Sequence, residues 1–259
     1  MSCCPPNAEK YLAPDYSFVG STVALDTGLE LYVTGTGASK KGLLIVPDIY
    51  GWNGGRTRNI ADYYAEEGYY VVVPKLLTPA IDGGTDGDGF AAIISMEHLV
   101  ENLMKFPYPG NLDAKMEATV AHMKAQGVES IGLMGFCWGG WVTACAVAPS
   151  SKVLPDIKVM VIGHPSNHLE NYFGGSAQTM FDNISVPTLL LPANGDPAEY
   201  DEEGAWFQSV KARYPTSKTY RFATVEHGFI PRADITIPEK RAAVDEAMEQ
   251  FTSFLKAHL

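Results

Sequence analysis

A cysteine between two glycines is the residue in this sequence best suited to covalent chemistry. Cys137 lies in Gly135-Phe136-Cys137-Trp138-Gly139, after an apolar run that begins at Ser130 and before another over residues 141–147. This order predicts a strand, a tight turn and a helix, with glycines that let strand and helix approach closely. Such an elbow presents its central side chain as a nucleophile. The alternative is a structural cysteine in a glycine-rich turn, because cysteine is often buried.

A candidate acid and a candidate base follow later in the chain, each after a predicted strand. Asp196 comes shortly after the apolar run 186–191, and His227 follows the predicted strand 218–225. The order nucleophile, acid, base is that of an α/β-hydrolase. Loops at the carboxyl ends of parallel strands line the site in such sheets, so we expect Cys137, Asp196 and His227 to meet. Taken singly, Asp196 could be a turn residue and His227 a capping or surface residue.

Together these side chains predict acyl transfer through a thiol. A helix N-terminus and a neighbouring imidazolium can lower a thiol pKa to roughly 3.5 to 7.5. His227 would then deliver the proton to the leaving oxygen, and Asp196 would fix the orientation of His227. The backbone N–H groups of Trp138 and Ile49 are the expected oxyanion hole.

The elements that must position these residues alternate between strands and helices. Apolar runs predict strands, including residues 43–46, 69–74, 130–135, 157–162 and 186–191. Helical patterns lie between or after them, at residues 57–67, 112–126, 203–214 and 239–258. An Asp-Thr-Gly turn within residues 21–33 predicts a hairpin before them. We therefore expect an α/β fold with a mostly parallel, doubly wound sheet and helices on both faces.

Residues 78–110 interrupt this alternation. An acidic, glycine-rich stretch at 82–89 precedes a predicted helix over 90–106. The acidic stretch lacks the ligand spacing and the final glutamate of a calcium loop, so we expect a solvated loop in a short lid-like insertion.

Length and composition predict a single domain over residues 21–259, preceded by a flexible N-terminal tail over 1–20. Net charge is −11 in 259 residues, which opposes binding to nucleic acid or to anionic membranes. The tail lacks a signal-peptide pattern, and no apolar run is long enough to span a membrane. The four cysteines form no disulfide framework. We expect a cytoplasmic protein and assign no metal site to the adjacent Cys3 and Cys4.

The remaining histidines are weaker candidates. His98 and His122 fall within predicted helices and are expected to be structural. His164 follows the strand ending at Ile162 and could face the pocket. His164 and His168 lack a third ligand and a helical setting, so no metal is predicted.

The chain resembles the dienelactone hydrolase family of α/β-hydrolases from about Leu29 to its C-terminus. The resemblance rests on residues 135–140, Asp196 and residues 226–229, and on the segments 47–51 and 68–74. It implies an α/β-hydrolase fold and hydrolysis of an ester or lactone through an acyl-thioester intermediate, without a cofactor. The implied site is the triad of Cys137, Asp196 and His227, with the oxyanion hole at Ile49 and Trp138.

Two departures from the family pattern concern activation and substrate. Bacterial members have a glutamate that switches the thiol to thiolate; here Asp48 stands there and is either a shorter switch or a polar loop residue. The family's arginine after the 69–74 strand is absent, which leaves Arg232 as the nearby cation or as a surface residue. The aromatic residues near the expected site favour a neutral or apolar acyl group: Tyr50, Trp52, Trp138 and Phe229.

We therefore predict a cysteine-dependent hydrolase of small-molecule esters or lactones, acting as a monomer or homodimer. A thioesterase or acyltransferase could use the same cysteine. A protein of another class, a non-catalytic thiol sensor, would carry a reactive Cys137 without turnover.

Overall fold

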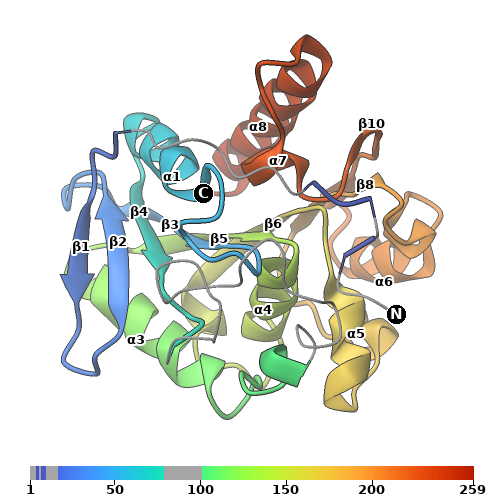
Figure 1. Ribbon diagram of the computed structural model, residues 1–259. Helices are drawn as coiled ribbons and strands as arrows, with labels where there is room; N and C mark the ends of the chain where they lie inside the picture. Colours follow the sequence, from blue (N-terminus) through green and yellow to red (C-terminus); the bar gives the residue numbers. More distant parts are fainter. Residues whose placement is uncertain (1–3, 6, 10–16, 79–100) are drawn as a thin grey trace.

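The computed structural model describes residues 4, 5, 7–9, 17–78 and 101–259, and Figure 1 shows a twisted sheet between two layers of helices. The main sheet has the order β1 (Ser21–Ala24), β2 (Glu30–Thr34), β4 (Tyr70–Pro74), β3 (Lys41–Val46), β5 (Ser130–Phe136), β6 (Ile157–Gly163), β7 (Thr188–Leu191), β9 (Lys218–Thr219). A short second sheet pairs β8 (Ala193–Asn194) with β10 (Phe222–Glu226).

The helices of the described residues follow the strands in the expected alternation. The α-helices are α1 (Thr57–Glu66), α3 (Leu112–Ala125), α4 (Trp138–Ala146), α5 (Ala177–Asp182), α6 (Ala205–Arg213), α7 (Phe229–Arg232) and α8 (Pro238–His258). Short 3-10 helices are η2 (Leu154–Asp156), η3 (Asn167–Phe173) and η4 (Ala198–Tyr200).

Strand pairing is parallel through the centre of the main sheet. In the core, Leu44 of β3 pairs with Val72 of β4 on one side and with Leu133 of β5 on the other. At one edge β1 and β2 form the predicted hairpin, and β2 pairs antiparallel with β4. The prediction of a mostly parallel, doubly wound sheet with helices on both faces is thus confirmed.

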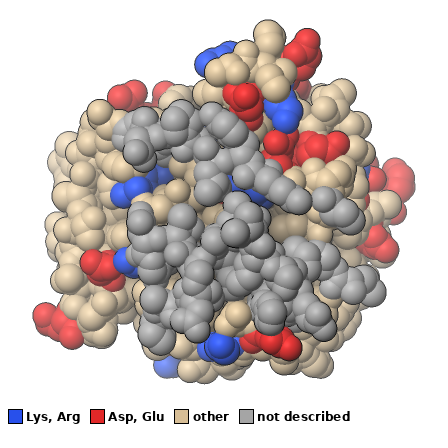
Figure 2. All heavy atoms as spheres, viewed as in Figure 1, with Lys and Arg blue, Asp and Glu red and all other residues tan. Residues whose placement is uncertain are grey.

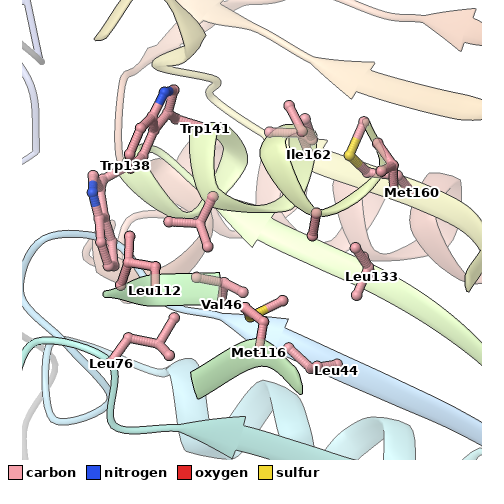
Figure 3. Packing of buried hydrophobic residues seen from close by; sticks show 14 of the residues in the cluster. Leu44, Val46, Leu76, Leu112, Met116, Leu133, Trp138, Trp141, Met160 and Ile162 are labelled. Atoms are coloured by element: carbon pink, nitrogen blue, oxygen red, sulfur yellow. The ribbon is translucent and has the colours of Figure 1, made fainter. Parts of the chain in front are cut away.

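The alternation of side chains along β3 divides the core into two layers. Leu44 and Val46 belong to the cluster on the side of α3 and α4, whereas Leu43 and Ile45 belong to the cluster on the side of α1 and α8. Figure 3 shows part of the first cluster: Leu44, Val46, Leu76, Leu112, Met116, Leu133, Trp138, Trp141, Met160 and Ile162. Burying one such aliphatic side chain contributes about 1.5–3 kcal/mol. The sheet is therefore held from both faces, which fixes the ends of its strands.

The predicted strand over residues 218–225 is wrong as a single element. Lys218 and Thr219 extend the main sheet as β9, whereas residues 222–226 pair with β8. Between them the Arg221 side chain turns inward, donating to Asp201 and to the carbonyl oxygens of Ala193 and Pro197. This break moves β10 out of the main sheet and sets the position of the residues that follow it.

The expected N-terminal tail and the expected insertion over residues 78–110 are described only in part. The acidic stretch 82–89 lies outside the described residues, as does most of the expected helix over 90–106. In the segment expected to be a flexible tail, Cys4 and Glu9 are instead buried, and Glu9 forms an ion pair with Lys240.

The face of the molecule seen in Figure 2 has no dominant basic region among its described residues. In the view of Figure 2, Asp and Glu lie around the outline, and the Lys and Arg residues visible among the described atoms form no continuous patch. Among the described residues, none of the helices combines the length and the apolarity needed to cross a bilayer.

Candidate active site

The nucleophile elbow joins β5 to α4 and holds Cys137 in a strained conformation. Cys137 has φ 55° and ψ −117°, backbone angles that residues other than glycine rarely adopt. A Cβ on Gly135 would lie 2.5 Å from the carbonyl oxygen of Gly139, and one on Gly139 would lie 2.3 Å from that of Val46. The flanking glycines are therefore required for the strand, the turn and the helix to pack at this distance.

The candidate acid and base meet because their strands form the second sheet. Asn194 of β8 is in register with Glu226 of β10, so the residues after each strand end lie side by side. Asp196 Oδ1 and His227 Nδ1 are 2.6 Å apart, and Asp196 Oδ2 accepts a 2.8 Å hydrogen bond from the backbone N–H of Ala193. Both side chains are buried. The carboxylate therefore orients the imidazole and is itself held in place.

Electrostatics favour the charged form of the His227 ring. Burial lowers the pKa of His227, but the Asp196 carboxylate and the Cys137 sulfur together raise it well above its ordinary value. Imidazolium stabilised in this way can support a neighbouring thiolate.

The sulfur of Cys137 lies in a cluster of nucleophilic groups. The sulfurs of Cys137 and Cys4 and a ring nitrogen of His227 all lie within 4.8 Å of one another. The Ser166 hydroxyl is 3.4 Å from Cys137 Sγ, and the sulfur of Cys4 is 3.5 Å from it. Two thiols and an imidazole are ligand types that suit zinc, but three protein ligands would make an open site. The absence of a metal requirement stays a prediction.

Sequence reasoning missed Cys4 and Ser166. Ser166 comes three residues after β6 ends, and polar residues near strand ends were the signal that could have found it. Its backbone N–H also donates to the carbonyl oxygen of Cys137, 3.2 Å away. Cys4 is 133 residues away in sequence, and nothing in a proline-rich tail indicates such a contact.

The expected oxyanion donors lie on the segments beside the elbow. Trp138 is the first residue of α4, so its backbone N–H has no acceptor within the helix. Ile49 follows β3, and its N–H donates to no backbone carbonyl of the described residues. The close approach of Gly139 to the Val46 and Pro47 carbonyl oxygens brings the end of β3 to the start of α4. Their role in an oxyanion hole stays a prediction.

Asp48 and Arg232 form a buried ion pair. Arg232 Nε donates to Asp48 Oδ2 at 2.7 Å, and the backbone N–H of Tyr50 donates to Oδ1 at 2.9 Å. The Arg232 guanidinium also lies 4.5 Å from the centre of the Tyr50 ring. Burial raises the pKa of Asp48 to about 6, against the lowering effect of the Arg232 charge. Both residues are at most 1% exposed, so Arg232 is a buried cation rather than a surface residue.

All three aromatic residues predicted to bind substrate are buried in the core: Tyr50 in one cluster, and Trp52 and Phe229 in the other. Phe229 contacts the rings of Phe222 and His164 at centroid distances of 5.1 and 6.0 Å. Trp52 belongs to the same cluster, with the Arg58 guanidinium 5.8 Å from its ring centre. Contact of any of the three with substrate stays a prediction.

The ring of His164 packs against the ring of His227. The two ring centroids lie 4.8 Å apart, and the backbone of His164 has φ 38°. Burial, followed by the charge of His227, lowers the pKa of His164 well below its ordinary value. A neutral ring at this position gives His227 an uncharged packing surface.

A cavity of about 570 Å³ lies elsewhere in the described residues, lined in part by Tyr108, Cys145 and Glu170. It includes no triad residue. Burial raises the pKa of Cys145 well above its usual range, so this thiol is a poor nucleophile. Geometry at the elbow, rather than cavity size, therefore locates the candidate site.

The chain is similar in sequence and in fold to known proteins. A carboxymethylenebutenolidase homolog from Rattus norvegicus is 23% identical over 250 residues, which cover 95% of this chain and 94% of the relative. Hydrolase tropI from Talaromyces stipitatus is 25% identical over 264 residues, covering 99% and 97%. The crystal structure of a candidate dienelactone hydrolase from Klebsiella pneumoniae has a TM-score of 0.67 at 16% identity, covering 93% and 99%.

The family profile described as "Dienelactone hydrolase family" matches residues 29–259, which is most of the chain and includes every residue of the elbow, the acid and the base. The α/β-hydrolase fold and the resemblance seen in the sequence are thereby confirmed, and the chain belongs to the dienelactone hydrolase family of hydrolases.

Proposed function

We propose that this protein hydrolyses carboxylic esters or lactones through an acyl-thioester on Cys137. The observation that carries the proposal is the buried Asp196–His227 hydrogen bond of 2.6 Å. A ring nitrogen of His227 also lies within 4.8 Å of the sulfur of Cys137, whose backbone is strained. A structural cysteine in a glycine-rich turn needs no oriented histidine beside it. The family match supports a hydrolase, and the names of the family and of the carboxymethylenebutenolidase homologs support an ester or lactone as the substrate.

The proposed first half-reaction forms the acyl-enzyme. Cys137 thiolate attacks the carbonyl carbon, and the N–H groups of Ile49 and Trp138 receive the developing oxyanion. His227 then gives its proton to the alkoxide oxygen as the C–O bond breaks. In the second half-reaction His227 removes a proton from water, hydroxide attacks the thioester, and Cys137 leaves as thiolate. Asp196 keeps the same ring nitrogen aimed at the sulfur throughout.

The Asp48–Arg232 pair supports a neutral acyl group. A guanidinium that already shares its charge with a buried carboxylate 2.7 Å away has less to gain from a second anion. We propose that Arg232 positions Asp48 beside the elbow rather than serving as the main anchor of a substrate carboxylate. Neutral aryl and alkyl esters should therefore have lower KM values than matched esters that carry a carboxylate.

The test is hydrolysis of small aryl esters by purified variants. Cys137→Ala should abolish turnover above the solution rate. Cys137→Ser should keep the fold and lose most of the rate, because His227 would have to deprotonate a much weaker acid. Cys145→Ser, a change at a partly buried thiol outside the site, is the matched control and should keep the wild-type kcat. Unchanged hydrolysis in Cys137→Ala would overturn the proposal.

A further inference from the structure

The described N-terminal residues 4, 5 and 7–9 lie against the loops that carry Asp196 and His227. The backbone N–H of Glu9 donates to the carbonyl oxygen of His227 at 2.8 Å, and Asn7 contacts the Glu226 side chain. Pro5 lies against Gly195, where a Cβ would be 3.6 Å from its ring. Figure 1 shows the dark-blue start of the chain beside β8 and α7. The segment therefore contacts both loops that supply the acid and the base.

At its first described residue, Cys4, this segment contacts the proposed nucleophile, Cys137. The sulfur of Cys4 lies 3.5 Å from that of Cys137, and Cys4 is 7% exposed while Cys137 is fully buried. A disulfide has an S–S length of about 2.05 Å, so the two sulfurs need to approach by roughly 1.5 Å. Cys137 is held in the elbow between β5 and α4, whereas Cys4 belongs to no helix or strand. The required movement therefore falls on the Cys4 side.

We propose that Cys4 is the resolving thiol for Cys137, so that a hydroperoxide converts the pair to a reversible disulfide. The proposal rests on the proposed function only for its consequence, which is loss of hydrolysis while the nucleophile is blocked. The disulfide itself depends on the two thiols and on the His227 imidazolium that favours thiolate at Cys137.

The chemistry balances with the peroxide as the oxidant. Cys137 thiolate attacks one peroxide oxygen, an S–O bond forms, and the O–O bond breaks. The departing oxygen takes the proton held by His227 and leaves as an alcohol or water. The sulfur of Cys4 then attacks the sulfenic acid, the S–S bond forms, and the hydroxide leaves as water with the proton of the Cys4 thiol. Two thiols are oxidised and one peroxide is reduced.

The contact also has a protective consequence. A sulfenic acid that meets no thiol can be oxidised further to a sulfinic acid, which thiol reductants do not reverse. Cys4 at 3.5 Å from Cys137 Sγ would capture the sulfenic acid first. Wild-type protein should thus recover from peroxide, whereas a protein without Cys4 should not.

The experiment uses reduced protein treated with a chelator and then with a small excess of hydrogen peroxide. Trypsin leaves Cys3 with Cys4 in residues 1–10, and Cys137 with Cys145 in residues 125–152. A Cys3→Ser, Cys145→Ser background removes this ambiguity, because the chain has four cysteines and the only remaining pair is Cys4 and Cys137. Intact mass and peptide mapping report the disulfide, and aryl-ester hydrolysis is measured separately.

In that background we expect the protein to lose the mass of two hydrogen atoms, to lose its activity, and to regain it fully with dithiothreitol. Adding Cys4→Ser should leave the reduced activity intact but give oxygen addition at Cys137 and a loss that dithiothreitol does not reverse. Far-ultraviolet circular dichroism checks that this variant is folded, and mapping of the background protein tests the pairing without it.

Several results would overturn the proposal. One is the absence of a linked peptide together with full recovery in the Cys4→Ser variant. Another is reversible inhibition that a chelator relieves without any change of mass, which would assign Cys4, Cys137 and His227 to a metal instead. Disulfide formation in a protein without hydrolase activity would leave this inference standing and refute the proposed function.

Discussion

Asp196→Asn separates the orienting role of this carboxylate from its bulk. Asp196 accepts from two donors, His227 Nδ1–H at 2.6 Å and the Ala193 N–H at 2.8 Å. An amide has one accepting oxygen and one donating NH₂ group, so it cannot serve both. If the oxygen stays on Ala193, the NH₂ group faces Nδ1 and forces the proton to the other ring nitrogen. His227 would then present the wrong tautomer to Cys137.

The magnitude follows from this geometry. A wrong tautomer in an otherwise intact triad lowers kcat on the order of 10⁴-fold, equivalent to about 5.4 kcal/mol. Losing a hydrogen bond to a charged group costs about 1.5–3 kcal/mol of stability, so the variant should remain folded. The two effects can therefore be measured on the same sample.

The assay is kcat/KM on a neutral aryl ester, with urea denaturation to confirm folding. Asp201→Asn is a matched control, because Asp201 lies in the same stretch but pairs with Arg221 at a partly exposed position. The control should lose less than tenfold. A loss in Asp196→Asn that is also below tenfold would refute the assignment of Asp196 as the orienting acid.

The remaining predictions concern the buried ion pair and the charge on His227. Asp48→Asn leaves the charge of the buried Arg232 unpaired and should lower the free energy of unfolding by about 3–5 kcal/mol in urea at pH 7. The control Glu30→Gln, at a partly exposed ion pair with Lys75, should lower it by at most about 1 kcal/mol. Equal losses in the two variants would contradict the account. Because the pKa of His227 is raised well above its ordinary value, alkylation of Cys137 by iodoacetamide should stay nearly constant from pH 6 to 8. In His227→Asn the alkylation rate should instead fall about tenfold for each pH unit below a thiol pKa of about 8.5. The same dependence of the rate on pH in both proteins would contradict the role of His227.

The raised pKa of His227 also has a sign for stability. A histidine whose pKa is higher in the folded than in the unfolded state stabilises the fold most below about pH 6.5. That contribution is lost as pH rises through the folded-state value. Protonated His227 therefore favours the folded state, and this contribution falls only when the pH passes the raised pKa of His227.

Most strands and helices were predictable because apolar runs mark buried strands, and a glycine with positive φ ends a helix. Leu112 begins α3 as predicted, and the helix ends before Gly127, which has φ 90°. The hairpin at residues 21–33 was signalled by its turn residues. The split of residues 218–226 was not predictable, because it depends on where Arg221 finds its acceptors far away in the sequence.

The triad candidates were found because chemistry and chain order coincide at strand ends. Cys137, Asp196 and His227 each follow a strand, and the second sheet brings the last two together. Cys4 and Ser166 were missed because their proximity to the sulfur is a property of tertiary structure. Arg232 was placed near His227 by sequence alone, but its burial against Asp48 required the fold.

The most direct test of the central claim is to trap the acyl-enzyme. Cys137 should become acylated when the wild-type protein is mixed with an excess of a neutral aryl ester and quenched in acid within a turnover. Intact mass should then show one added acyl group, and peptide mapping should place it on Cys137 in residues 125–152, sensitive to hydroxylamine as a thioester is. Turnover of the ester with no acyl group on Cys137, or with the acyl group on another residue, would contradict the account.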